Sequence, residues 1–139
     1  MPLTVRSAGH DDIGPILDLW QGAAENRGRP GDTREAVETV LGRDPAALIV
    51  AVDDELVGTI IVGWDGWRCH LYRLAVRPDR RRLGIGQALL AAAEERSRTL
   101  GATRIDAMVL DDNDLGQTIW RASGYRRQAD WRRWVKPLS

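Results

Sequence analysis

The sequence predicts a single α/β domain, spanning residues 1–139, in which helices cover both faces of a mixed sheet. A chain of this length suits one domain with a buried core of its own. Strand and helix patterns alternate from His70 to about Gln128, which is typical of parallel strands joined by helices. Before them, two apolar runs separated by a tight turn predict an antiparallel meander.

The N-terminal part of the chain is predicted to form one strand and two helices. Residues 3–7 read as the strand, and Gly9-His10-Asp11-Asp12 opens a helix whose apolar residues recur at helical spacing. The acidic pair suits the positive end of that helix. Asp32-Thr33-Arg34-Glu35 has capping-box spacing with Asp32 as the cap, and predicts a second helix through about Leu41.

Three strands are predicted in the middle of the chain. Residues 47–52 and 56–62 are apolar and contain many β-branched side chains, and Asp53-Asp54 between them predicts a tight turn. Trp64-Asp65-Gly66-Trp67 predicts a second turn. A third strand follows over His70–Val76 and ends before Pro78.

Helices and strands alternate in the last part of the predicted fold. Residues 86–100 carry an apolar stripe at helical spacing, which Gly101 ends. A strand over 104–110 and a helix from the Asp111–Asp114 cap to Ser123 come next. Two short strands, over 125–128 and 131–135, complete the predicted order β-α-α-β-β-β-α-β-α-β-β.

Composition narrows the classes of function. Acidic and basic residues balance at 20 each, so net charge gives no argument for nucleic acid or an anionic membrane as the main partner. The single cysteine, Cys69, excludes an internal disulfide and a thiolate zinc cluster, and no metal is expected. Neither a signal-peptide pattern nor an apolar run of membrane-spanning length is found, so a cytoplasmic location is expected.

A basic loop with two glycines, between a strand and a helix, carries the most chemistry. It reads Arg77-Pro78-Asp79-Arg80-Arg81-Arg82-Leu83-Gly84-Ile85-Gly86-Gln87. Glycines admit close backbone approach, a helix start offers N–H donors, and arginines add charge for phosphate. The loop therefore indicates a pyrophosphate site or, as the alternative, an ordinary helix start with a solvated basic loop. It lacks the third glycine of a dinucleotide fingerprint and the Gly-Lys-Ser or Gly-Lys-Thr of a Walker loop.

These residues resemble the GNAT superfamily of N-acetyltransferases. Arg81-Arg82-Leu83-Gly84-Ile85-Gly86 matches that family's signature of Gln or Arg, two residues, Gly, one residue, then Gly or Ala. Ala75-Val76 precedes it at the expected distance. A second set of residues falls where the family has Asn, Ala, Tyr and Gly-Phe: Asn113, Gly116, Trp120 and Gly124-Tyr125. The resemblance covers nearly the whole chain and looks like that to small bacterial members of the ribosomal-protein-acetyltransferase type.

The resemblance implies the GNAT acyl-CoA N-acyltransferase fold and acetyl-CoA as the co-substrate. In this family the strands that match 70–76 and 104–110 splay apart, and pantetheine pairs in the gap like an extra strand. The residues that the resemblance places against acetyl-CoA are Leu74, Ala75, Val76, Arg81, Arg82, Leu83, Gly84, Ile85, Gly86, Gln87, Asn113 and Trp120.

For the chemistry, the resemblance implies direct attack of a neutral primary amine on the thioester, assisted by a base and by oxyanion donors. His70 and Tyr72 are the candidate catalytic residues, because they alternate onto one strand face and histidine titrates near neutrality. The alternative is a hydrogen-bonded sheet histidine and a packed tyrosine. Cys69 is interpreted as core rather than nucleophile. Trp120 replaces the family's Tyr acid, and its indole favours packing over acid chemistry.

Two other functions stay open at the level of sequence. One is a non-catalytic acyl-CoA sensor, which the Trp120 replacement motivates. The other is an RNA- or protein-interaction domain that uses Arg126-Arg127 and Arg132-Arg133 beside Trp131 and Trp134. At zero net charge, a solvated terminal hairpin or a homodimer contact is favoured over nucleic-acid binding. The acceptor, a small-molecule amine or a protein or peptide amine, is left open.

Overall fold

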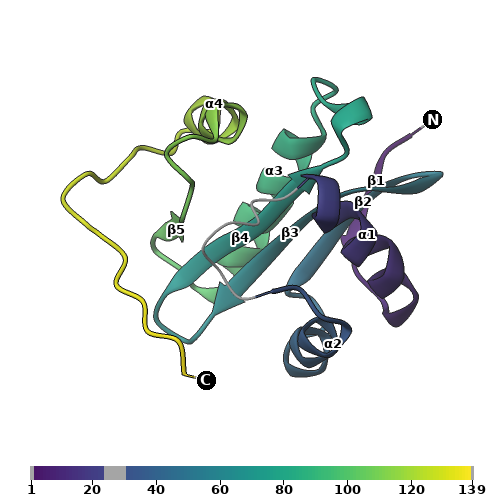
Figure 1. The fold of residues 1–139 in the computed structure, drawn as a ribbon, viewed down its shortest axis with the longest axis horizontal. Coiled ribbons are helices and arrows are strands. Elements are labelled where there is room, and N and C mark those ends of the chain that lie inside the picture. Colours follow the sequence, from purple (N-terminus) through teal and green to yellow (C-terminus); the bar gives the residue numbers. More distant parts are fainter. Residues whose placement is uncertain (1, 24–30, 139) are drawn as a thin grey trace.

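The computed structural model describes residues 2–23 and 31–138. The strands form one five-stranded sheet in the order β1-β2-β3-β4-β5, in which β4 and β5 are parallel and all other neighbours are antiparallel (Figure 1). The strands are β1 (Thr4–Ser7), β2 (Leu48–Asp53), β3 (Glu55–Trp64), β4 (Cys69–Val76) and β5 (Ile105–Ala107). The helices are α1 (Ile13–Ala23), α2 (Arg34–Arg43), α3 (Ile85–Leu100) and α4 (Asp114–Ala122), with short 3₁₀ turns η1 (His10–Asp12) and η2 (Pro78–Arg80).

Two hydrophobic cores, one on each face of the sheet, confirm the predicted layers. In Figure 1, α1 and α2 lie on the near face and α3 lies behind the sheet. Buried side chains of α1 such as Ile16 and Trp20 pack against Leu48 and Ile61 on the near face. On the far face, the α3 and α4 side chains pack against the alternate strand residues. The predicted α/β architecture is thus confirmed.

Local hydrogen bonds fix where the first two helices begin. Asp12 accepts from the Gly9 N–H at 2.7 Å and pairs with Arg6, which closes the turn before α1. The cap of α2 is Thr33, whose hydroxyl accepts from the Ala36 N–H at 3.0 Å. The prediction of Asp32 as the cap is therefore wrong by one residue. The physical reason is that the Asp32 carboxylate pairs with Arg73 of β4 instead.

The end of the chain departs from the predicted order. The strand expected over 104–110 is reduced to Ile105–Ala107, because only three residues pair with β4. The strands expected over 125–128 and 131–135 are absent from the described structure, in which the chain beyond α4 runs as irregular backbone (Figure 1). Extended residues form a strand only against a partner edge, and the short β5 offers few places to pair.

Candidate active site

A gap opens between the parallel strands β4 and β5. They pair from Cys69 opposite Ile105 to Leu71 opposite Ala107, and the register then ends although β4 continues to Val76. Because the Arg77 N–H donates to the Val57 carbonyl on β3 at 2.9 Å, the alternation of the ladder directs the Val76 N–H and C=O the other way, toward the gap. This edge of β4 can therefore pair with an extended ligand.

The loop that follows β4 has a backbone conformation that suits an anion. Arg82 and Gly84 both have left-handed conformations, with φ of 65° and 81°. Gly84 caps the 16-residue helix α3, and the space around its missing side chain is open. The first-turn N–H groups of α3 lack intrahelical partners and point toward the N-terminus of the helix, where this loop lies. Left-handed residues before a helix start make a concavity of N–H donors, which suits a phosphate.

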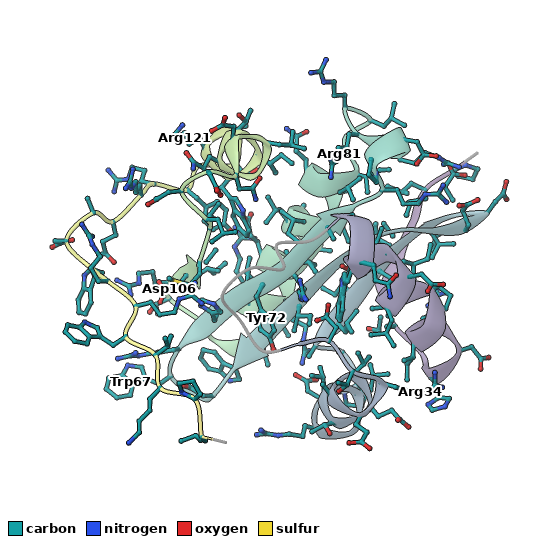
Figure 2. All side chains as sticks on the ribbon, viewed as in Figure 1. Arg34, Trp67, Tyr72, Arg81, Asp106 and Arg121 are labelled. Atoms are coloured by element: carbon teal, nitrogen blue, oxygen red, sulfur yellow. The ribbon has the colours of Figure 1, made fainter. Side chains whose placement is uncertain are left out.

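The arginines of this loop divide into two kinds. Arg77 pairs with Glu55 and Asp79, and Arg80 pairs with Asp53 at 3.0 Å. Arg81 and Arg82 form no ion pair within the described ranges, 2–23 and 31–138. Figure 2 shows Arg81 at the start of α3, at the opposite end of the sheet from Trp67. Among the described residues, the charges of these two arginines are thus not neutralised by an ion pair, and both lie in the loop that leads into α3.

The other residues expected at the cofactor on β4 and at the start of α3 differ in how far their side chains are buried. Ala75, Val76 and Ile85 are at most 7% exposed and face the two cores, and Leu74 is half-buried beside them. Leu83 and Gln87 are exposed. A side chain on Gly86 would reach Ile119 of α4 at 3.6 Å, so this glycine lies where α3 and α4 meet.

Asn113 and Trp120 lie at the two ends of α4. The Asn113 side chain caps the helix and accepts from the Gly116 N–H at 2.9 Å. Trp120 is 8% exposed and meets the Tyr125 ring edge-on at 4.8 Å. The Tyr125 hydroxyl in turn donates to Glu94 of α3 at 2.8 Å. Trp120 thus packs in the core, and contacts of both residues with acetyl-CoA stay predictions.

His70 and Tyr72 lie together on the α1–α2 face of β4. Their ring centroids are 5.8 Å apart. Burial lowers the pKa of His70; the charge of Asp106, opposite it on β5, raises that pKa, and the charge of Arg133 lowers it. Burial raises the pKa of Tyr72, although 40% of this residue is exposed. Near neutrality the arrangement holds a neutral imidazole beside a protonated phenol.

Cys69 lies in the core, as the sequence interpretation expected, and is on the opposite face of β4 from His70. It is 1% exposed and its sulfur lies 3.2 Å from the Ser97 hydroxyl within the α3 core. No sequence pattern indicated that the charges of Asp106 and Arg133 act on His70. Asp106 could be found only once the register of β4 and β5 was known, and Arg133 was grouped with a hairpin that does not form.

Within the described ranges, no helix has the length and apolarity needed to span a membrane. The same residues include no group of three or more His, Cys, Asp or Glu side chains that could hold a metal ion.

Comparisons with known proteins agree with this architecture. The acetyltransferase (GNAT) family matches residues 14–125. Acetyltransferase SG1711 of Sodalis glossinidius is 34% identical over 128 residues, covering 91% of this chain and 89% of that protein. The crystal structure of Ard1 from Thermoplasma volcanium superposes with a TM-score of 0.80 at 21% identity, covering 93% of this chain and 86% of that one. A predicted acetyltransferase from Clostridium acetobutylicum, solved with acetyl-CoA, gives 0.75 at 13% identity and 96% coverage of both chains. The chain therefore belongs to the GNAT family of acetyltransferases.

Proposed function

We propose that this enzyme transfers the acetyl group of acetyl-CoA to a primary amine by direct attack. The observation that carries the proposal is the continuity of two ligand-binding features: the unpaired edge of β4 leads directly into the left-handed loop at the start of α3. A ligand with an extended arm that ends in a pyrophosphate would occupy both features at once, with the arm along the β4 edge and the pyrophosphate at the loop. The structural neighbour from Clostridium acetobutylicum, which has the same fold, was solved with acetyl-CoA.

In this proposal the pyrophosphate lies on the N–H groups from Leu83 to Gln87, with Arg81 and Arg82 adding charge. Pantetheine then runs along the backbone of Leu74–Val76, and Asn113 borders it from α4. Gly84 and Gly86 allow the close approach, because a side chain at the first would project into the open space over the loop. The thioester reaches the region of β4 that carries His70 and Tyr72.

The chemistry proposed there conserves protons at every step. The amine nitrogen attacks the thioester carbonyl carbon, forming a C–N bond, and the C–S bond breaks as CoA thiolate leaves. His70, neutral because its pKa is lowered, accepts the proton lost by the amine. Tyr72, whose phenol is protonated near neutrality because even the ordinary tyrosine pKa lies well above it, can donate to the thiolate. Trp120 takes no part in proton transfer.

The acceptor class in the proposal is an amine, either a small molecule or the amine of a protein or peptide. A cytoplasmic location is part of the proposal and suits the free, buried thiol of Cys69. A homodimer stays a prediction. The sensor alternative differs from the enzyme in one respect: it binds CoA without turnover.

The test is a thermal-shift titration with acetyl-CoA, CoA and ATP. We expect a stabilisation of several degrees with acetyl-CoA and CoA but not with ATP, lost in Gly84→Trp. Gly101→Trp is the matched control, because Gly101 caps the other end of α3 with φ 96° and equally open space. Release of thiol with an amine panel then separates enzyme from sensor. No shift of the wild-type protein with any CoA species would refute the proposal.

A further inference from the structure

Arg73 has a strained backbone in the middle of β4. Its φ of 57° is left-handed, a conformation that residues with L side chains rarely adopt and that persists only where the surrounding structure holds it. The register against β3 shifts here: Thr59 lies opposite Ala75, whereas Ile61 lies opposite Tyr72. Two steps on β3 thus match three on β4, which makes this a β-bulge.

The side chain of Arg73 is held by residues of the N-terminal helical segment. It is only 8% exposed, and it pairs with Asp32, the residue before the cap of α2. Its guanidinium carbon also lies 4.8 Å from the ring centroid of Trp20 on α1. A nearly buried cation that is both paired and stacked on an indole is anchored in position and direction.

The backbone of Arg73 is held by the same tryptophan. The Thr59 hydroxyl donates to the Arg73 carbonyl at 2.9 Å and accepts from the Trp20 indole N–H at 2.8 Å. Trp20 is 3% exposed and Thr59 is fully buried, so both bonds are shielded from water. Trp20 therefore holds the guanidinium with its ring and the carbonyl through Thr59.

The bulge lies where the active-site gap begins. Pairing between β4 and β5 ends at Leu71, Tyr72 comes next, and Arg73 follows directly. We infer that Arg73 is a positioning residue, which holds the bulge of β4 against α1 and Asp32 and so orients the strand edge that meets the acetyl thioester. The inference rests on the proposed function and assigns Arg73 no contact with the substrate.

The experiment measures the dissociation constants of CoA and acetyl-CoA separately by calorimetry. CoA affinity reports the phosphate loop and the pantetheine edge, whereas the ratio of the two constants reports the acetyl thioester alone. The variants are Arg73→Gly, which tolerates the left-handed φ but lacks both anchors, Arg73→Lys, which loses the planar stack, and Asp32→Asn. Arg98→Ala is the control, since Arg98 forms an exposed pair with Glu95 on α3.

We expect wild type to prefer acetyl-CoA, and Arg73→Gly and Asp32→Asn to lose about fivefold or more of that preference while CoA affinity stays within about twofold. That change corresponds to about 1 kcal/mol at the thioester. Arg73→Lys should lie between, and Arg98→Ala should match wild type.

Three outcomes would overturn the inference. They are no preference for acetyl-CoA in wild type, an unchanged preference in the variants, and a proportional loss of both affinities, which a merely structural role would give. If Arg73→Gly fails to fold, the preference for acetyl-CoA over CoA in Arg73→Lys and Asp32→Asn tests the inference instead. Failure of wild type to bind CoA at all would instead refute the proposed function.

Discussion

At the scale of the residue, His70 shows how neighbours set a pKa. Burial of His70 on the α1–α2 face of β4 disfavours the charged imidazolium and lowers the His70 pKa. The charge of Asp106 raises this pKa, whereas the charge of Arg133 lowers it. The sequence places His70 and Tyr72 on one face by alternation, but the pKa depends on β5 and on the C-terminal segment. A base for an ammonium substrate must be unprotonated near neutrality, and the lowered pKa meets that need.

The titration of His70 should therefore respond in opposite directions to its two charged neighbours. Asp106→Asn should lower the His70 pKa further, and Arg133→Gln should raise it, as measured by NMR titration of the histidine ring protons with His10→Gln to assign the signals. Shifts of the same sign in both variants would contradict the placement of these charges.

The lowered pKa of His70 also makes the stability of the fold depend on pH, because proton binding and folding are linked. The pKa of His70 in the folded protein lies below the ordinary 6.5, so the unfolded chain binds the proton at a higher pH than the folded protein does. The free energy of unfolding therefore decreases as pH falls from above 6.5 through the folded pKa. Over the same pH range, the free energy of unfolding of His70→Gln should decrease less than that of the wild-type protein.

At the scale of the element, the loop between β4 and α3 separates structural from available arginines. Arg77 and Arg80 tie the loop to the β2–β3 hairpin through Asp53 and Glu55. Arg81 and Arg82 follow in sequence but lack such pairs among the described residues, so their charges can serve a ligand. The family resemblance already singles out Arg81 and Arg82, and the position of the hairpin supplies the physical reason, because its carboxylates pair with Arg77 and Arg80.

Neutralising these arginines should weaken acetyl-CoA binding selectively. Arg81→Gln with Arg82→Gln should raise the dissociation constant about tenfold, a loss of about 1.4 kcal/mol, and should make binding less sensitive to salt. Arg80→Gln is the control, and it should alter stability by less than about 1 kcal/mol and leave affinity near wild type. Calorimetry at two salt concentrations measures both. An equal loss of affinity for Arg80→Gln would show that the loop's shape, rather than these charges, governs binding.

At the scale of the whole molecule, the two cores account for the fold and the C-terminal segment lies outside them. The described residues from Arg126 to Leu138 are exposed, with Trp131 at 70% and Trp134 at 94%. Tyr125 is the last residue to pack, against Trp120 and Glu94. The boundary of the stable unit therefore falls after Tyr125.

Truncation should confirm that boundary. Deleting the chain after Gln128 should change the free energy of unfolding by less than about 1 kcal/mol and, because Arg133 is removed, should raise the His70 pKa. Deletion after Ser123, which also removes Tyr125, should cost about 2–3 kcal/mol. Urea unfolding measures both. A large loss in the first truncation would mean that the C-terminal segment packs on the protein in solution.

Local patterns in the sequence were enough to predict the layers of the fold, the strand–loop–helix around Gly84 and Gly86, and the shared face of His70 and Tyr72. These follow from local periodicity and backbone preference, which neighbours in sequence decide. Contacts between distant segments set the remaining features: Arg73 forms a bulge, Asp32 pairs with it rather than capping α2, Asp106 lies beside His70, and the expected last strands lack a partner. Pairing, burial and charge contacts join residues far apart in the chain, and their energies depend on distances that no local pattern contains.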